Sequence, residues 1–282
     1  MTAILRNLPF HGEYYVNQVL GKSGKIESHR LCYENSEDTV TFNVFTSLQS
    51  NRRAIREVAR HITGTETMQD VELYLWGGRI DLENGTFEHP YRPLEKVRGC
   101  LEQDITAFQT EPDIMLVVPG EALICIEAKF GSSNPSAKEV KEAAGQKSKS
   151  VDCLIDRYCH KNSMVNCQEI FDLGNLPAIF PEQLFRNVIF AASMAAYTGI
   201  PAWYVVNLRS QHVMNLRRGQ PQGMPIVRSM RGMLQGPYKK RFSHWTWEDI
   251  FEAVVAGNPD LHNLAWYMKN KTLNCRRAFN IL

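Results

Sequence analysis

Apolar residues recur at helical spacing early in the chain. Ser36 can cap a helix whose apolar residues lie one turn apart (Val40, Val44 and Leu48). A second amphipathic run follows from Asn51 to Ile62. Glu37 lies three residues before Val40, so we expect its carboxyl group near the buried stripe. A charge there is costly unless it is paired or bound to a metal.

Short apolar runs bounded by turn residues predict strands further along. The run Val71–Trp76 ends at Gly77-Gly78. The runs Ile114–Val118 and Ala122–Phe130 are separated only by Pro119-Gly120-Glu121, which is typical of a β-hairpin. Ala202–Leu208, which follows a Gly-Ile-Pro stop, has the composition of a further buried strand.

The remaining patterns predict helices. Asn134-Pro135 can open a polar helix that reaches roughly to Tyr158, and Pro181 can open the largely apolar helix EQLFRNVIFAASMAAY. Two short closing helices are expected at Trp245–Val255 and Asp260–Lys269. The succession predicts a single α/β domain, 1–282, with its core at about 30–210 and a basic segment and helical addition at about 209–282.

The hairpin brings together residues that can perform chemistry. If its turn is centred on Gly120, Val118 faces Ala122 and Asp113 faces Glu127, with Cβ atoms roughly 5 Å apart. Lys129 shares that face and Ala128 points away. Two such close carboxylates repel each other, and a divalent cation that prefers oxygen ligands, Mg²⁺ or Mn²⁺, would compensate them. Lys129 could then orient or deprotonate a water, which predicts phosphodiester hydrolysis.

A plainer interpretation stays open beside this one. Asp113 could merely start a strand, and Glu127 could pair with Lys129 at a sheet edge. Acidic-x-Lys triplets are common by chance. The whole pattern favours the site: Pro112-Asp113, a short hairpin, and Glu127-Ala128-Lys129 at the end of an apolar strand.

The segment PDIMLVVPGEALICIEAKF resembles the signature of the PD-(D/E)XK, or restriction-endonuclease-like, nuclease superfamily. SEDTVTFNVF, EQLFRNVIFA and WTWEDIFEAV resemble parts of a little-characterised bacterial and phage group within it. The resemblance implies an αβββαβ core in which helices flank a mixed central sheet, with extra C-terminal helices.

Carried over by position, the resemblance implies a role for four residues. Asp113 and Glu127 would be metal ligands, Lys129 the catalytic lysine, and Glu37 an additional acidic contact to the metal or its water. Members of the superfamily often place a Gln or a basic residue on a following helix to contact substrate. Here the candidates for that contact are Gln146, Gln183 and Arg186.

Charge distribution adds a candidate for binding nucleic acid. The net charge is only +2, yet the stretch from Val205 to Arg241 contains eight basic residues, Arg217 and Arg218 among them, and no acidic one. It is either a solvated loop or a surface that follows phosphates. The expected partner is therefore nucleic acid, DNA before RNA, and a homo-oligomer is left open.

Other features narrow the function classes. No apolar run is long enough for a membrane helix, and the seven cysteines are scattered, so we expect a cytoplasmic location. Gly21-Lys22-Ser23 lacks the earlier glycine of a phosphate-binding loop, and the spacing of Cys153, Cys159, His160 and Cys167 fits no zinc or iron–sulfur pattern well. The competing hypotheses are a catalytically silent nucleic-acid-binding protein with the same fold and a nuclease that cuts RNA.

Overall fold

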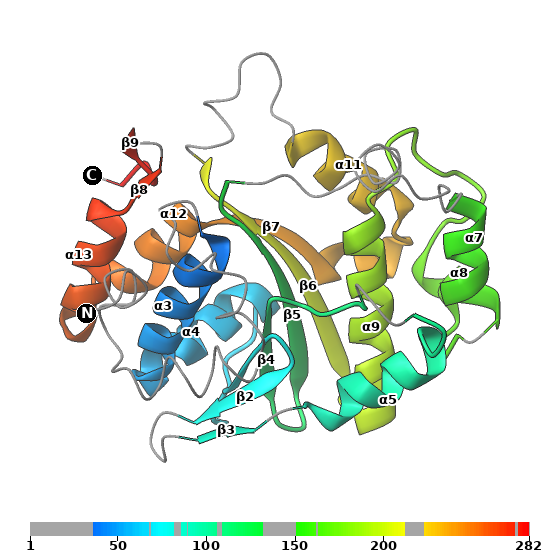
Figure 1. Ribbon diagram of the computed structural model, residues 1–282, viewed down its shortest axis with the longest axis horizontal. Helices are drawn as coiled ribbons and strands as arrows, with labels where there is room; N and C mark the ends of the chain where they lie inside the picture. The colour runs from blue at the N-terminus through cyan, green and yellow to red at the C-terminus, as the bar shows by residue number, and fades with distance from the viewer. Residues whose placement is uncertain are drawn as a thin grey trace.

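The computed structural model describes most of the chain from residue 36 onward. It covers residues 36–67, 69–81, 86–88, 90–105, 109–131, 151–161, 163–211, 223–273 and 276–281. Two helical layers enclose one mixed sheet (Figure 1). None of the described helices is both long and apolar enough to cross a membrane.

The sheet contains seven strands in the order β3-β2-β1-β4-β5-β6-β7. Their bounds are β1 Glu72–Leu75, β2 Gly78–Asp81, β3 Thr86–Glu88, β4 Ile114–Val118, β5 Ala122–Lys129, β6 Ala202–Arg209 and β7 Phe242–Thr246. The strands from β3 to β5 pair antiparallel, whereas β5, β6 and β7 run parallel. The carboxyl ends of the three parallel strands therefore meet at one end of the sheet. A separate small ladder joins β8 (Thr272–Leu273) to β9 (Arg276–Arg277).

One layer consists of the first and last helices. It contains α3 (Glu37–Gln49), α4 (Arg52–Thr63), α12 (Trp247–Ile250) with the π-helical turn Phe251–Val255, the 3-10 turn Pro259–Leu261 and α13 (His262–Asn270). Ser36 caps α3 as predicted, since its side chain accepts from the Thr39 N–H at 3.2 Å. Asn51 caps α4 in the same way.

The other layer packs on the opposite face of the sheet. It contains α5 (Arg92–Leu101), α7 (Val151–Ile155) with the π-helical turn Asp156–Lys161, α8 (Cys167–Ile170), α9 (Glu182–Thr198) and α11 (Gly223–Met233). The predicted apolar helix after Pro181 is confirmed as α9. It ends at Gly199, whose φ of 71° is a left-handed conformation that glycine adopts without strain.

Several elements differ from the sequence prediction. The pattern gave no strand at β2 or β3 and no helix at α5. The closing helix predicted from Trp245 begins only at Trp247, because the residues before it pair with β6 as strand β7 and Thr246 caps the helix. The predicted helix from Asn134 falls mostly outside the described residues, and its described end continues past Tyr158 to Lys161.

The basic stretch is not a single loop. Most of its described residues belong to β6, α11 and the 3-10 helix Gly236–Arg241 that precedes β7. Because β7 runs parallel to β6 and Phe242 pairs with Val205, Lys239 and Lys240 lie before the start of β7. Arg209, at the end of β6, lies four residues beyond Val205 along the strand. The two lysines are therefore at least about 13 Å from that end of the sheet.

Candidate active site

The β4–β5 hairpin has the predicted register. Val118 pairs with Ala122 and Ile114 pairs with Ile126, around a turn in which Gly120 has a φ of 72°. One further step places Asp113 opposite Glu127. The Ala128 N–H donates to Oδ2 of Asp113 at 2.9 Å, which fixes this carboxyl group across the open end of the hairpin.

A strained turn lies beside Asp113. Trp76 has a φ of 48°, the only positive φ at a described residue other than glycine, and Gly77 follows with 72°. Two positive φ values in a row suit a tight hairpin turn, here the one joining β1 to β2. The Trp76 N–H donates to the backbone oxygen of Asp113 at 3.2 Å, so this turn helps to hold the residue.

Glu127 is fully buried, and both of its carboxylate oxygens accept hydrogen bonds. Oε1 accepts from Lys129 Nζ at 2.6 Å, and Oε2 accepts from Asn187 Nδ2 of α9 at 2.8 Å. A carboxylate with no exposed surface requires such donors, because the apolar sheet around it offers no water.

Glu37 reaches the same end of the sheet from the first turn of α3. Its Oε2 accepts from the Phe130 N–H at 2.8 Å, and its Oε1 lies 3.4 Å from Lys129 Nζ. A quarter of its side chain is exposed. The predicted neighbourhood of Glu37, Asp113, Glu127 and Lys129 is therefore confirmed, although the four residues come from three elements and span 93 positions of the chain.

Burial and mutual charge shift the acid–base chemistry of the cluster. Burial and the charge of Glu127 raise the pKa of Asp113 well above its ordinary value, against a smaller opposing effect of Lys129. Burial alone would lower the pKa of Lys129, but Glu127, Asp113 and Glu37 outweigh it, so the net pKa is raised. Lys129 is consequently held as an ammonium group among three carboxyl groups.

A polar row continues from Glu127 across the parallel strands. Asn207 on β6 pairs with Glu127, and His244 on β7 pairs with Asn207. The Nδ1 of His244 lies 2.9 Å from the backbone oxygen of Asn207, an arrangement that leaves Nε2 as the nitrogen able to meet a ligand. Burial lowers the pKa of His244, and the positive charges of Arg209 and Arg231 lower it further.

Three buried residues that the sequence analysis did not single out also lie at the cluster. Asn187 and Asn207 are buried amides within apolar runs, and Trp247 donates its Nε1–H to the backbone oxygen of Lys129 at 3.2 Å. A polar residue inside an otherwise apolar helix or strand was the available signal, because burial of an amide requires a partner. The hydrogen-bond partner of each amide could be identified only from the fold.

The predicted substrate contacts have different outcomes. Gln183 lies one turn before Asn187 on α9, so the two share a helix face. Arg186 is largely buried and lies 3.9 Å from both Glu102 and Glu182. The other three candidates, Gln146, Arg217 and Arg218, lie outside the described residues.

The donor set fits a divalent cation with oxygen ligands. Three carboxyl groups face one lysine, and none of the described residues hydrogen-bonds to Oδ1 of Asp113. Within the described part of the chain no group of three His, Cys, Asp or Glu side chains forms a ready-made cation site, and the Lys129 ammonium lies between Glu127 and Glu37. The excess of negative charge and the raised pKa of Asp113 are what a bound cation would relieve.

Comparison with models of known protein families, with curated proteins and with solved structures gives no match to this chain.

Proposed function

We propose that this chain is a metal-dependent nuclease of the PD-(D/E)XK type that hydrolyses phosphodiester bonds in DNA. The observation that carries the proposal is the meeting of Asp113, Glu127 and Lys129 on one face at the open end of the hairpin, with Glu37 beside them. The order α3, β1, β4, β5, α9, β6 also fits the αβββαβ succession of that superfamily.

The residues divide the chemical work. Asp113 and Glu127, with help from Glu37, would hold Mg²⁺, for which Mn²⁺ could substitute. The cation would supply a polarised phosphoryl oxygen and a bound water that is more acidic than bulk water. Lys129 would stabilise negative charge that grows on the phosphoryl group, and its raised pKa favours this electrostatic role over that of a base.

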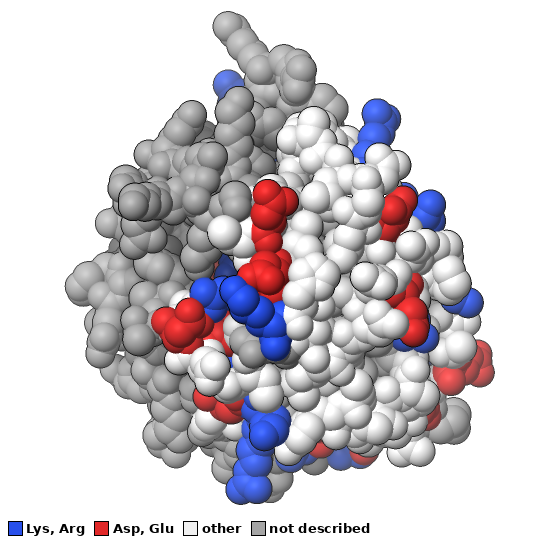
Figure 2. Space-filling model, turned by 90° about the vertical axis from the view of Figure 1, so that its right-hand side faces the viewer, with Lys and Arg blue, Asp and Glu red and all other residues white. Residues whose placement is uncertain are grey.

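The surface near α7 and α8 bears on where a nucleic acid could bind. On the side of the molecule near α7 and α8, acidic and basic side chains lie next to one another beside a broad area without charge (Figure 2). A surface that follows a polyanion would carry one sign over a long distance. The described part of this face does not have that pattern.

The proposal is tested by incubating the purified protein with single-stranded, duplex, nicked and branched DNA and with RNA, each in Mg²⁺, Mn²⁺ or EDTA. We expect metal-dependent cleavage of at least one DNA form. Cleavage of RNA alone would show that the protein is a ribonuclease and contradict the proposed DNA substrate. Binding without cleavage in every metal would favour the catalytically silent protein.

The Asn187 amide is expected to strengthen metal binding. Asn187→Leu keeps the branching of the side chain but leaves Oε2 of the buried Glu127 without its donor, so the unfolding free energy of the metal-free protein should fall by about 1–3 kcal/mol. Loss of a residue that orients a ligand should also weaken Mn²⁺ binding by about 10-fold. Urea denaturation and Mn²⁺ titration measure the two effects.

Ser193→Ala is the matched control for Asn187→Leu. Ser193 is buried on the same helix, and its hydroxyl has no hydrogen-bond partner among the described residues, so its removal should leave Mn²⁺ affinity unchanged. An Asn187→Leu protein that binds Mn²⁺ as tightly as wild type would show that Asn187 serves only packing.

Arg217 and Arg218 are expected to contact phosphates, because they follow Arg209 at the site end of β6 in the sequence. Replacing both by alanine should weaken DNA binding for all sequences and reduce the slope of log K against log salt by about one unit per lost contact. The control replaces Lys239 and Lys240, which lie before β7 at a distance from that end, and should leave the slope unchanged. Equal slopes for both double variants and wild type would show that Arg217 and Arg218 do not contact phosphates and lie in a solvated loop.

A further inference from the structure

Glu102 is a fully buried carboxyl group outside the candidate active site. It follows the last residue of α5, and its oxygens accept three hydrogen bonds. Oε2 accepts from the Thr110 N–H at 2.7 Å, and Oε1 accepts from the Tyr158 hydroxyl at 2.6 Å and from the Thr110 hydroxyl. Arg186 of α9 provides the nearby positive charge, with Nη1 3.9 Å from Oε1.

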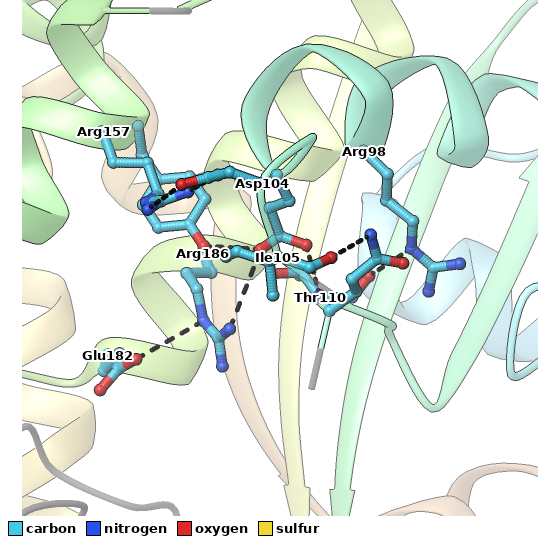
Figure 3. A network of polar contacts seen from close by, with 10 residues as sticks. Arg98, Asp104, Ile105, Thr110, Arg157, Glu182 and Arg186 are labelled. Atoms are coloured by element: carbon cyan, nitrogen blue, oxygen red, sulfur yellow. Dashed lines mark hydrogen bonds and ion pairs between the residues drawn. The ribbon is translucent and has the colours of Figure 1, made fainter. Parts of the chain in front are cut away.

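This network joins three separate parts of the second helical layer (Figure 3). Arg98 of α5 donates to the Thr110 oxygen, Arg157 of the π-helical turn pairs with Asp104, and Arg186 of α9 lies 3.9 Å from both Glu102 and Glu182. A buried carboxylate is costly unless donors and a counter-charge surround it, and here both are present. Its contacts therefore fix the relative positions of α5, α9 and the segment that runs toward β4.

One branch of the network leads to Asp113. Thr110, which makes two of the three hydrogen bonds to Glu102, is only three residues before Asp113. Arg98 holds the same segment, because its Nε donates to the Thr110 oxygen and its Nη2 to Glu111, each at 3.0 Å. The backbone that carries Asp113 into the hairpin is thus held at two consecutive residues.

The other branch leads to Glu127. Arg186, the counter-charge of Glu102, is followed directly by Asn187, which donates to Glu127 at 2.8 Å. Adjacent residues of one helix cannot shift independently. A single buried carboxyl group therefore ties the segment that carries Asp113 to the helix that holds Glu127.

We infer that Glu102 is a positioning residue that sets the separation of Asp113 and Glu127, and through it the affinity of the site for a divalent cation. This inference rests on the proposed function, since it assigns the two carboxyl groups to a metal. Mg²⁺ requires nearly ideal octahedral geometry with oxygens at about 2.0–2.1 Å, so a small displacement of one ligand against the other weakens binding. Glu102 touches neither carboxyl group and acts only through Thr110 and α9.

The test is a titration of Mn²⁺ into the metal-free full-length protein, with the Mg²⁺ concentration for half-maximal single-turnover cleavage as a second readout. Glu102→Gln keeps the shape but turns one oxygen into an amide group that cannot accept from its present donors. We expect the Kd for Mn²⁺ to rise about 10-fold, the lower end for residues that orient ligands, and the rate to recover to within a few-fold of wild type at saturating Mg²⁺. Asp104→Asn removes one carboxylate two residues away at an exposed ion pair with Arg157, and should leave the Kd within twofold.

A merely structural Glu102 gives a different result. Glu102→Gln would then lower the thermal midpoint and leave the Kd for Mn²⁺ unchanged, which overturns the inference. If Glu102→Gln does not fold, Thr110→Val decides: loss of one hydroxyl contact should raise the Kd about threefold, and an unchanged Kd overturns the inference. Failure of the proposed function gives a different result, because folded wild-type protein would then bind no Mn²⁺. If only this inference fails, wild type still binds Mn²⁺ and Asp113→Asn does not.

Discussion

Replacing Asp113 by asparagine is expected to abolish metal-dependent cleavage and at the same time to stabilise the metal-free protein. Cleavage should slow by on the order of 10³-fold or more, because a ligand and its charge are lost at the reacting phosphoryl group. Stability should rise because burial and Glu127 disfavour the ionised form of Asp113, which raises its pKa, and asparagine carries no charge to be disfavoured.

The stabilisation of the Asp113→Asn protein has a defined pH dependence. Since the pKa of Asp113 is raised on folding, the native protein binds more protons than the unfolded chain between the two pKa values, and wild-type stability falls as pH rises through that window. Below the unfolded value of about 4 the difference between variant and wild type should vanish, and it should grow toward neutral pH. Urea denaturation in EDTA at several pH values measures it.

Added Mg²⁺ should reverse the order of stability. A ligand at 100 times its Kd stabilises the protein that binds it by about 2.7 kcal/mol, and only wild type retains the site. Equal responses of wild type and Asp113→Asn to Mg²⁺, or full cleavage by the variant, would remove Asp113 from the metal site.

Lys129→Ala is expected to separate the chemical step from binding. Many basic residues share the grip on a long polyanion, so binding should stay within a few-fold of wild type. The ammonium group lies 2.6 Å from Glu127, where the proposed hydrolysis would build up negative charge, so the single-turnover rate should fall at least ~10²-fold. Rapid-quench cleavage and a filter-binding titration supply the two numbers.

Lys129→Arg tests which role the lysine plays. Arginine keeps the charge but scarcely deprotonates, and its planar head must fit where the side chain is largely buried. A good rescue would support pure charge stabilisation, in agreement with the raised pKa of Lys129. An alanine variant that cuts as fast as wild type would make Lys129 a structural residue that neutralises Glu127.

Local patterns predicted the parts of the fold that depend on local interactions. The cap of α3, the helix α9 and the β4–β5 register all follow from spacing and turn chemistry within a few residues. Strand β7 could not be predicted in this way, because FSHWT becomes a strand through its pairing with β6. The helix predicted from Trp245 began two residues too early for the same reason.

In the candidate site, too, local contacts could be predicted from the sequence and long-range contacts could not. Asp113, Glu127 and Lys129 are joined by one hairpin, so their proximity could be derived from the sequence. The contacts of Asn187 with Glu127, of His244 with Asn207 and of Glu102 with Tyr158 join elements far apart in the chain, and only the packed layers bring them together. Arg186 illustrates the limit. The family resemblance suggested a substrate contact, with a purely structural tie as the alternative, and its described neighbours are Glu102 and Glu182.

The most direct test of the account is single-turnover cleavage of end-labelled DNA by wild type and Glu127→Gln, purified in parallel and assayed in Mg²⁺ and in EDTA. Glutamine preserves the shape of the buried side chain and removes its charge and one acceptor oxygen. If the proposed site is correct, wild type cuts in Mg²⁺ and not in EDTA, and Glu127→Gln in Mg²⁺ is slower by on the order of 10³-fold or more. Cleavage that survives EDTA, or that proceeds at the same rate in both proteins, would contradict it.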